Sequence, residues 1–368
     1  MLKLKNNIVQ LSWLRGMAII FVLFSHILRV IEIDNATGEK LDIFPLLKCL
    51  DIGSFGVLLF FALSGCTLYI SLSQREFKRS GFLIRRFFRI WPLFTFSIVV
   101  YVFFSISMSQ YTETAVNLWI TNQLSYSLSM QDLVYYLLLI NNYFGQYQII
   151  NGAYWSLPVE FQFYLMFSII YPVIYRTPLW ISIIFTISIV VLSYVLYLYL
   201  NTRTSYNDYV FFKSIFSFLG GIIVAKVYLR KAYRYNLLFV FLAISSILFL
   251  AVFIRYTPLI TTLHIEAWVL LSLLLLWIVL NMNTSKLINL KLLKVLEMFG
   301  TVSYSMYLFH NLLIMGTFLI FESLIDFQAW AAQILYAIFI MAAAYFISKI
   351  IYEQLEVKII NFGRKYEK

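Results

Sequence analysis

The sequence predicts an all-α polytopic membrane protein with about ten transmembrane helices. Of its 368 residues, 62% are hydrophobic and 19% aromatic, whereas only 12% are charged. A chain this apolar is not typical of a soluble globular protein, and its apolar residues are grouped into windows of about 20, the length that spans a bilayer. The windows lie near residues 11–31, 52–73, 91–108, 154–175, 179–200, 209–229, 236–254, 261–280, 298–321 and 329–352.

The distribution of Lys and Arg predicts the orientation of these helices. With ten crossings and a cytoplasmic N-terminus, 22 of the 28 basic residues fall on the cytoplasmic side. This agrees with the positive-inside rule, so we expect both termini in the cytoplasm. The rule also accounts for the net charge of +11, and we therefore expect no nucleic-acid partner.

Two features of the chain lie outside this simple pattern of windows. Residues 131–144 are apolar but too few to span a bilayer, and Asn141 and Asn142 lie near their end, so we predict a re-entrant or interfacial helix. An eleventh crossing is the alternative. The expected organisation is a transmembrane domain over residues 1–354 and a short cytoplasmic tail over 355–368. No Cys or His spacing indicates a metal site.

The first window carries two polar residues that a membrane helix normally avoids. In LSWLRGMAIIFVLFSHI, residues 11–27, Arg15 and His26 are eleven residues apart. At about 100° per residue they share one helix face, roughly 16 Å apart along the axis. Because ionisable groups are costly inside a bilayer, they indicate a functional site. The alternatives are a histidine hydrogen-bonded between helices and an arginine that extends to the lipid headgroups.

Two later windows carry further polar candidates. WSLPVEFQFY, residues 155–164, places Glu160 and Ser156 in the fourth window, at a depth close to that of His26. A carboxylate beside an imidazole favours its charged form and fixes its tautomer, so we predict a Glu160–His26 pair. A glutamate bonded to hydroxyls between helices is the alternative. In the ninth window, His310 and Asn311 are expected to line the same cavity or to be packed structurally.

The densest cationic stretch is REFKRSGFLIRRFFRIWP, residues 75–92. It contains Arg85, Arg86 and Arg89, and the last two share a helix face at the expected cytoplasmic surface. Guanidinium groups bind phosphate oxygens in a bidentate manner, so these arginines, joined by Arg15, are candidates for a phosphate site. The alternative is that the stretch only determines topology.

Five motifs in order resemble the acyltransferase-3 family of integral membrane O-acyltransferases. They are the first-window segment from Leu11 to His26, GVLLFFALSG at 56–65, RRFFRIWP at 85–92, WSLPVEFQFY at 155–164 and YSMYLFH at 304–310. The sequence departs from the family pattern at Ser12, Leu58 and Phe161, where the family usually has an acidic residue. These departures affect expectations about the substrate, because Arg15, His26, the arginine stretch and Glu160 are all present.

The resemblance implies an enzyme of the bacterial cytoplasmic membrane, surrounded by membrane lipid. It implies acetyl-CoA or another acyl-CoA as the donor and a hydroxyl of a cell-surface glycan, or of its lipid-linked precursor, as the acceptor. His26 is then the general base or a covalent acyl carrier, with Glu160 as its partner. His310, Ser156 and Asn311 are possible second catalytic or acceptor-site residues.

Two other classes of protein fit the same composition. A secondary transporter or flippase for a polar or glycan substrate also has internal charges, although such proteins usually have related halves, which are not visible here. A structural membrane subunit is disfavoured by the histidine and glutamate residues within the windows.

Overall fold

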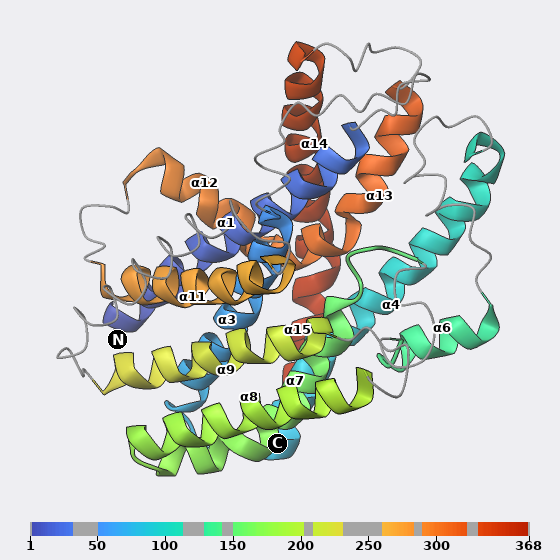
Figure 1. The fold of residues 1–368 in the computed structure, drawn as a ribbon. Helices are drawn as coiled ribbons and strands as arrows, with labels where there is room; N and C mark the ends of the chain where they lie inside the picture. Colours follow the sequence, from blue (N-terminus) through green and yellow to red (C-terminus); the bar gives the residue numbers. More distant parts are fainter. Residues whose placement is uncertain are drawn as a thin grey trace. The chain divides into compact units, whose positions relative to one another are not determined.

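The computed structural model describes residues 2–31, 51–112, 129–141, 150–201, 209–230, 260–282, 289–321 and 330–366. Within these ranges every regular element is helical, as predicted (Figure 1). The helices are α1 (Leu2–Ile31), α3 (Ile52–Leu72), α4 (Arg79–Thr112), α6 (Met130–Leu137), α7 (Ser156–Arg176), α8 (Leu179–Asn201), α9 (Tyr209–Leu229), α11 (Ile260–Asn281), α12 (Lys291–Thr301), α13 (Ser303–Phe321), α14 (Trp330–Ile351), a π-helical turn (Tyr352–Glu356) and α15 (Val357–Arg364).

Six helical segments of the described chain are long and apolar enough to cross a membrane, which indicates a multi-pass membrane protein. They are Val9–Val30, Ile52–Leu72, Arg79–Ser107, Ser156–Arg176, Ser303–Phe321 and Ala331–Arg364. Shorter apolar segments lie within α8, α9 and α11. The predicted window 236–254 lies outside the described residues. Ten crossings and cytoplasmic termini therefore stay predictions.

The described part of the apolar segment at 131–144 overlaps a short helix, α6, which has only eight residues. At 1.5 Å per residue this is about 12 Å, too short to cross a bilayer. A capping box starts it: the Ser129 side chain accepts from the Asp132 backbone N–H, and the Asp132 carboxylate accepts from the Ser129 backbone. The helix is tied to α4, because the Trp91 indole N–H donates to the Leu137 carbonyl at 2.8 Å.

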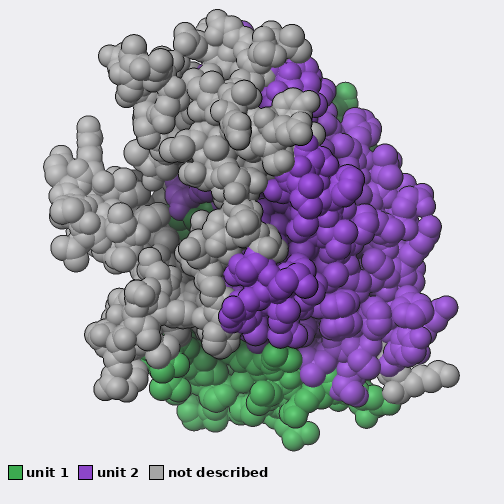
Figure 2. All heavy atoms as spheres, turned by 90° about the vertical axis from the view of Figure 1, so that its right-hand side faces the viewer, with its two compact units in different colours: residues 1–18, 54–79, 163–300 green, residues 19–53, 80–162, 301–368 purple. Residues whose placement is uncertain are grey.

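The chain forms two compact units, coloured separately in Figure 2. Unit 1 comprises residues 1–18, 54–79 and 163–300, and unit 2 comprises residues 19–53, 80–162 and 301–368. The first predicted span is thus one continuous helix whose two parts belong to different units.

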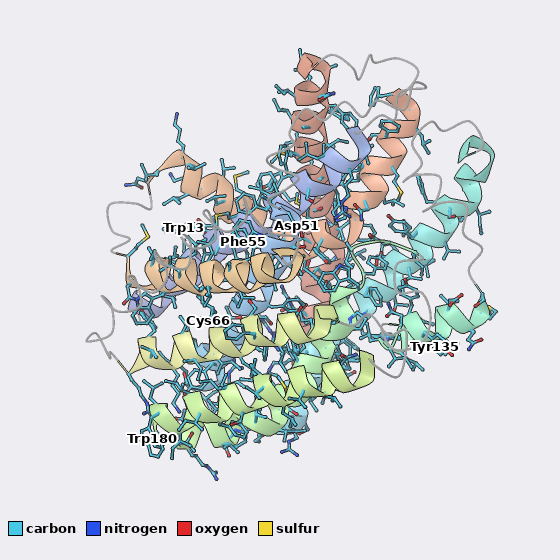
Figure 3. The ribbon with its side chains drawn as sticks, viewed as in Figure 1. Trp13, Asp51, Phe55, Cys66, Tyr135 and Trp180 are labelled. Carbon is cyan, nitrogen blue, oxygen red and sulfur yellow. The ribbon has the colours of Figure 1, made fainter. Side chains whose placement is uncertain are left out.

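Unit 1 contains a close contact between α3 and α9 that depends on glycine. A Cβ atom on Gly65 would overlap the carbonyl of Phe218, and one on Gly221 would overlap the carbonyl of Ala62. These glycines therefore permit the close packing of the two helices. In the same unit, α8 exposes apolar side chains, including Trp180 at 63% (Figure 3), as a lipid-facing helix would.

A buried lysine joins three helices of unit 1. Lys226 on α9 is 1% exposed. Its ammonium group donates to the Ile174 carbonyl, to the Thr177 carbonyl at 2.7 Å and to the Ser182 hydroxyl at 2.6 Å. Carbonyls at the C-terminal end of a helix lack intrahelical partners, and a cation there is favourable. Lys226 therefore fixes the end of α7 and the turn into α8.

Unit 2 is built around α4, α13 and α14, of which α13 and α14 lie side by side (Figure 1). Tyr154, immediately before α7, is fully buried against α4. Its ring centroid is 5.1 Å from that of Phe94 and 5.9 Å from that of Tyr101, and its hydroxyl donates to Ser97 Oγ at 2.7 Å. These contacts hold the start of α7, with Ser156 and Glu160, in a fixed place in unit 2.

Candidate active site

The two candidate histidines of unit 2 lie against each other. His26 on α1 and His310 on α13 have ring centroids 4.9 Å apart, with their planes inclined at 57°. The side chains are 8% and 0% exposed, respectively. From the sequence, His310 is expected either to line the same cavity as His26 or to be packed structurally, and direct contact between the two rings is not predicted. The structure thus brings together two imidazoles that are 284 positions apart in the chain.

Hydrogen bonding fixes the tautomer of His310. Its Nδ1 atom lies 2.9 Å from the Tyr307 carbonyl oxygen and 3.2 Å from that of Met306. A carbonyl oxygen only accepts, so Nδ1 carries the proton in the neutral ring and Nε2 carries the lone pair. Nε2 is buried and has no hydrogen-bond partner among the described residues. His310 therefore keeps an unused proton acceptor in the interior of unit 2.

Tyr307, one turn before His310, connects the histidines to α7. Its ring centroid is 5.9 Å from that of His310. Its hydroxyl donates to the Ala153 carbonyl at 2.6 Å and lies 2.7 Å from Ser156 Oγ. Because the single phenolic proton is used on the carbonyl, Ser156 is the donor in the Ser156–Tyr307 bond. Ser156 is thus placed beside the cluster, although its role in the reaction stays a prediction.

Asn311 forms a second connection between α13 and the segment before α7. Its Nδ2 atom donates to Asn151 Oδ1 at 2.6 Å, and the same oxygen accepts from the Ala153 backbone N–H at 2.9 Å. Asn151 in turn donates to the Leu308 carbonyl at 3.4 Å. The Oδ1 atom of Asn311 is buried without a hydrogen-bond partner in the described chain. Asn151 is not predicted by sequence, because nothing local indicates that a loop amide contacts α13.

Glu160 is half-buried on α7, one turn after Ser156. Residues four apart on a helix share a face, so both project to the same side of α7. The carboxylate interacts electrostatically with the hydroxyl groups of Tyr304 and Tyr307. Two tyrosines of α13 are thus within electrostatic range of Glu160, and the predicted Glu160–His26 pair stays a prediction.

The arginine stretch lies at the start of α4, where Arg85, Arg86 and Arg89 are all half-buried. The Arg86 guanidinium carbon lies 5.7 Å from the centroid of the Phe82 ring. The Arg89 guanidinium lies over the Tyr304 ring at the same distance and forms an ion pair with Glu356, with Nη1 and Oε1 3.4 Å apart. Glu356 and Tyr304 are absent from the sequence-based site.

The remaining candidate, Arg15, belongs to unit 1, so its predicted association with the arginine stretch stays a prediction. Over the described residues there is no group of three His, Cys, Asp or Glu side chains suited to a metal ion. Cys66 is a buried free thiol of α3 in unit 1 (Figure 3).

The fold and the site define an all-helical membrane protein with a buried imidazole pair and a half-buried group of arginines. A family model described as an acyltransferase domain matches residues 8–353. The chain belongs to this family, the acyltransferase-3 family of membrane O-acyltransferases, which confirms the resemblance drawn from the five motifs. Comparison with curated proteins and with solved structures gives no significant match.

Proposed function

We propose that the protein is a membrane O-acyltransferase of the bacterial cytoplasmic membrane. The donor is a cytoplasmic acyl-CoA, with acetyl as the acyl group, and the acceptor is a hydroxyl of a cell-surface glycan or of its lipid-linked precursor. Family membership supports acyl transfer, and the motifs resembling the O-acetyltransferases support the donor and acceptor.

The observation that carries the proposal is the contact between His26 and His310. Acyl transfer from a thioester to an alcohol needs a group that removes the hydroxyl proton as the oxygen attacks. Imidazole is the side chain best suited to this near neutral pH. Two adjacent imidazoles in an apolar helical bundle cost free energy, so their presence there supports a functional role.

In the proposed reaction, the acceptor oxygen attacks the thioester carbonyl carbon while His26 takes the hydroxyl proton. The tetrahedral intermediate then collapses, the carbon–sulfur bond breaks, and the proton passes to the leaving thiolate of CoA. His310 supports this step, since its Nε2 lone pair is able to accept a proton or a hydrogen bond from its neighbour. A route in which His26 first takes the acyl group itself uses the same arrangement.

The donor site is assigned to Arg86 and Arg89 on α4, with Arg85 and Arg15 as additional cations. The nucleotide of CoA carries several phosphate charges and is excluded from lipid, so it binds at the cytoplasmic surface. Its slender pantetheine arm carries the thioester towards the histidines. Cation–π contacts of Arg86 with Phe82 and of Arg89 with Tyr304 support this role, because each contact holds a guanidinium group in place before phosphate binds.

The test combines a cellular and a purified system. Surface polysaccharide from cells with and without the gene is compared by NMR for O-acetyl signals. Purified protein is then incubated with acetyl-CoA labelled in the acetyl group and with glycan-containing lipid extract. Gene-dependent O-acetyl signals and labelled glycan are expected. Movement of a glycan across vesicles without any acylated product would instead favour a transporter or flippase.

A further inference from the structure

A carboxylate near the end of the chain, that of Glu356, lies against the arginine stretch. The helix α14 does not stop at Ile351 but passes through the π-helical turn Tyr352–Glu356 into α15. A π-helical turn contains one residue more than an α-helical turn, and such turns are frequent at functional sites. Glu356 ends the turn and is only 2% exposed, whereas Glu353 in the same turn is exposed.

Glu356 has two partners in unit 2. Its Oε2 atom accepts a hydrogen bond from the Ser305 hydroxyl at 2.6 Å, and its Oε1 atom forms the 3.4 Å ion pair with Arg89. A buried carboxylate is costly unless it is paired and hydrogen-bonded. The ion pair is longer than a charge-assisted hydrogen bond, which is about 2.7–2.9 Å, and Oε1 has no hydrogen bond among the described residues.

The exposure of this pair is asymmetric. The carboxylate is 2% exposed, but 36% of the Arg89 side chain is accessible. The guanidinium also lies over the Tyr304 ring, whose hydroxyl donates to the Ile90 carbonyl at 2.7 Å, the residue next to Arg89. Arg89 is therefore held from the interior by a charge and a ring, while part of the side chain reaches the surface.

The packing of α15 also holds the turn of α4 that contains Arg89. Gly363 lies against Phe88, and a Cβ atom on this glycine would come within 2.5 Å of the Phe88 Cβ atom. The Phe88 ring also contacts those of Phe362 and Tyr366, with centroids 5.6 and 6.2 Å away. The residues after 354, predicted from sequence to be a cytoplasmic tail, thus include a helix packed on the arginine stretch.

We propose that Glu356 is a positioning residue that holds the Arg89 guanidinium in the orientation needed to bind a phosphate of the acyl-CoA donor. The inference rests on the proposed function, because it assigns a role within the donor site. Bidentate binding of phosphate requires a defined guanidinium plane, and an arginine oriented in advance loses less conformational entropy on binding. Glu356 acts through Arg89 and does not touch the donor.

The test is Glu356→Gln, with Glu353→Gln as the matched control in the same π-helical turn. Glutamine keeps the size of the side chain and still accepts from Ser305, so folding is preserved, but the charge facing Arg89 is lost. Purified proteins are titrated with CoA, and the KM and kcat of transfer are measured for acetyl-CoA and for acetyl-pantetheine, which lacks the nucleotide phosphates.

For Glu356→Gln we expect CoA affinity to fall, and the KM for acetyl-CoA to rise, by about five- to twentyfold, the loss of one charged contact. The kcat at saturating donor and the KM for acetyl-pantetheine stay within about twofold, and Glu353→Gln matches the wild type. Ser305→Ala gives a smaller rise in the KM for acetyl-CoA. In the Arg89→Lys background, Glu356→Gln adds little, because both changes remove the same interaction.

Three outcomes overturn the inference. An equal loss for both donors indicates a structural role, and unchanged affinity indicates no role. Tighter CoA binding by Glu356→Gln shows that the carboxylate competes with phosphate instead of orienting Arg89. Failure of the proposed function is distinguishable, because then the wild type neither binds CoA nor transfers an acyl group, whereas failure of the inference alone leaves a normal wild type.

Discussion

Each unit contains a buried polar cluster, around Lys226 in unit 1 and around His310 in unit 2, and the two clusters satisfy their hydrogen-bonding groups to different degrees. In unit 1, the Lys226 ammonium group has three N–H donors and three acceptors, the Ile174 and Thr177 carbonyls and the Ser182 hydroxyl. In unit 2, His310 Nε2 and Asn311 Oδ1 are buried without hydrogen-bond partners among the described residues. In the first cluster every ammonium donor has an acceptor within the folded chain. In the second cluster two acceptor atoms are left, to which a substrate can donate hydrogen bonds.

This difference separates a structural from a functional polar cluster. A buried polar atom without a partner costs about 1–3 kcal/mol, so such atoms persist where they have a purpose. Lys226 has no remaining donor for a ligand and closes the end of α7. The atoms around His310 keep an acceptor beside a second imidazole, as a proton-transfer site requires. Substitutions in the two units should therefore affect different measurable quantities.

The largest effect on acyl transfer is expected for His26→Ala. Removal of the general base should lower kcat on the order of a thousandfold, the range of acid–base catalysis. Binding of CoA and insertion in the membrane stay unchanged, because the arginine stretch is intact. The control is His264→Ala on α11, which should keep wild-type activity. Near wild-type transfer by His26→Ala would assign the base to another residue.

His310→Gln should have the next largest effect, a fall in kcat of about a hundredfold. Glutamine fills similar space and is polar, but its amide has no titratable nitrogen to replace the imidazole beside His26. Kinetics of purified protein, with membrane insertion measured in parallel, give the result. If His310→Gln lost activity completely while His26→Ala kept most of it, the roles of the two histidines would be exchanged.

Glu160→Gln should lower transfer by about tenfold, the size expected when a residue that orients a catalytic group loses its charge. The half-buried carboxylate acts on Tyr304 and Tyr307, and Tyr307 in turn contacts His310. Glu353→Gln, an exposed glutamate of unit 2, is the control. Transfer at the wild-type rate by Glu160→Gln would contradict both this connection and the predicted pair with His26.

The sequence was sufficient to predict helices and individual site residues, because apolar windows and buried charges are local signals. The helix α3 (Ile52–Leu72) agrees with its predicted window 52–73 to within one residue. Contacts between distant segments were harder to predict. The similar depths of His26 and His310 were compatible with a shared cavity or with structural packing, and helix rotation, which determines contact, depends on packing between segments that are distant in the sequence.

Glu356 shows a second limit of sequence analysis. Its position near the end of the chain, among basic and polar residues, is typical of a solvated tail. A π-helical turn contains one additional residue and so rotates the rest of the helix by about 100° relative to a regular α-helix. No composition signal marks such a turn, and the facing residues Ser305 and Arg89 belong to distant helices. The pairing was therefore visible only in the structure.

The smallest effect on transfer, and the largest difference between the two units, is expected for Lys226→Met. Methionine is similar in length and well suited to an apolar interior, but it removes the ammonium donor at the end of α7. The Thr177 carbonyl then keeps only the longer hydrogen bond from Arg230, at 3.2 Å. The free energy of unfolding should fall by about 1–3 kcal/mol, measured by thermal denaturation in detergent. The kcat and KM per folded molecule should stay within about twofold of the wild type, since no group of unit 2 has changed.

The matched control for this variant is Lys294→Met on α12, an exposed lysine of the same unit. It removes one positive charge without breaking a buried cluster, so it should change neither the denaturation temperature nor the kinetics. A normal denaturation temperature of Lys226→Met with a reduced kcat would show that the satisfied lysine has a catalytic role. A fully hydrogen-bonded polar cluster would then not be purely structural, and hydrogen-bond satisfaction would not distinguish structural from functional clusters in this protein.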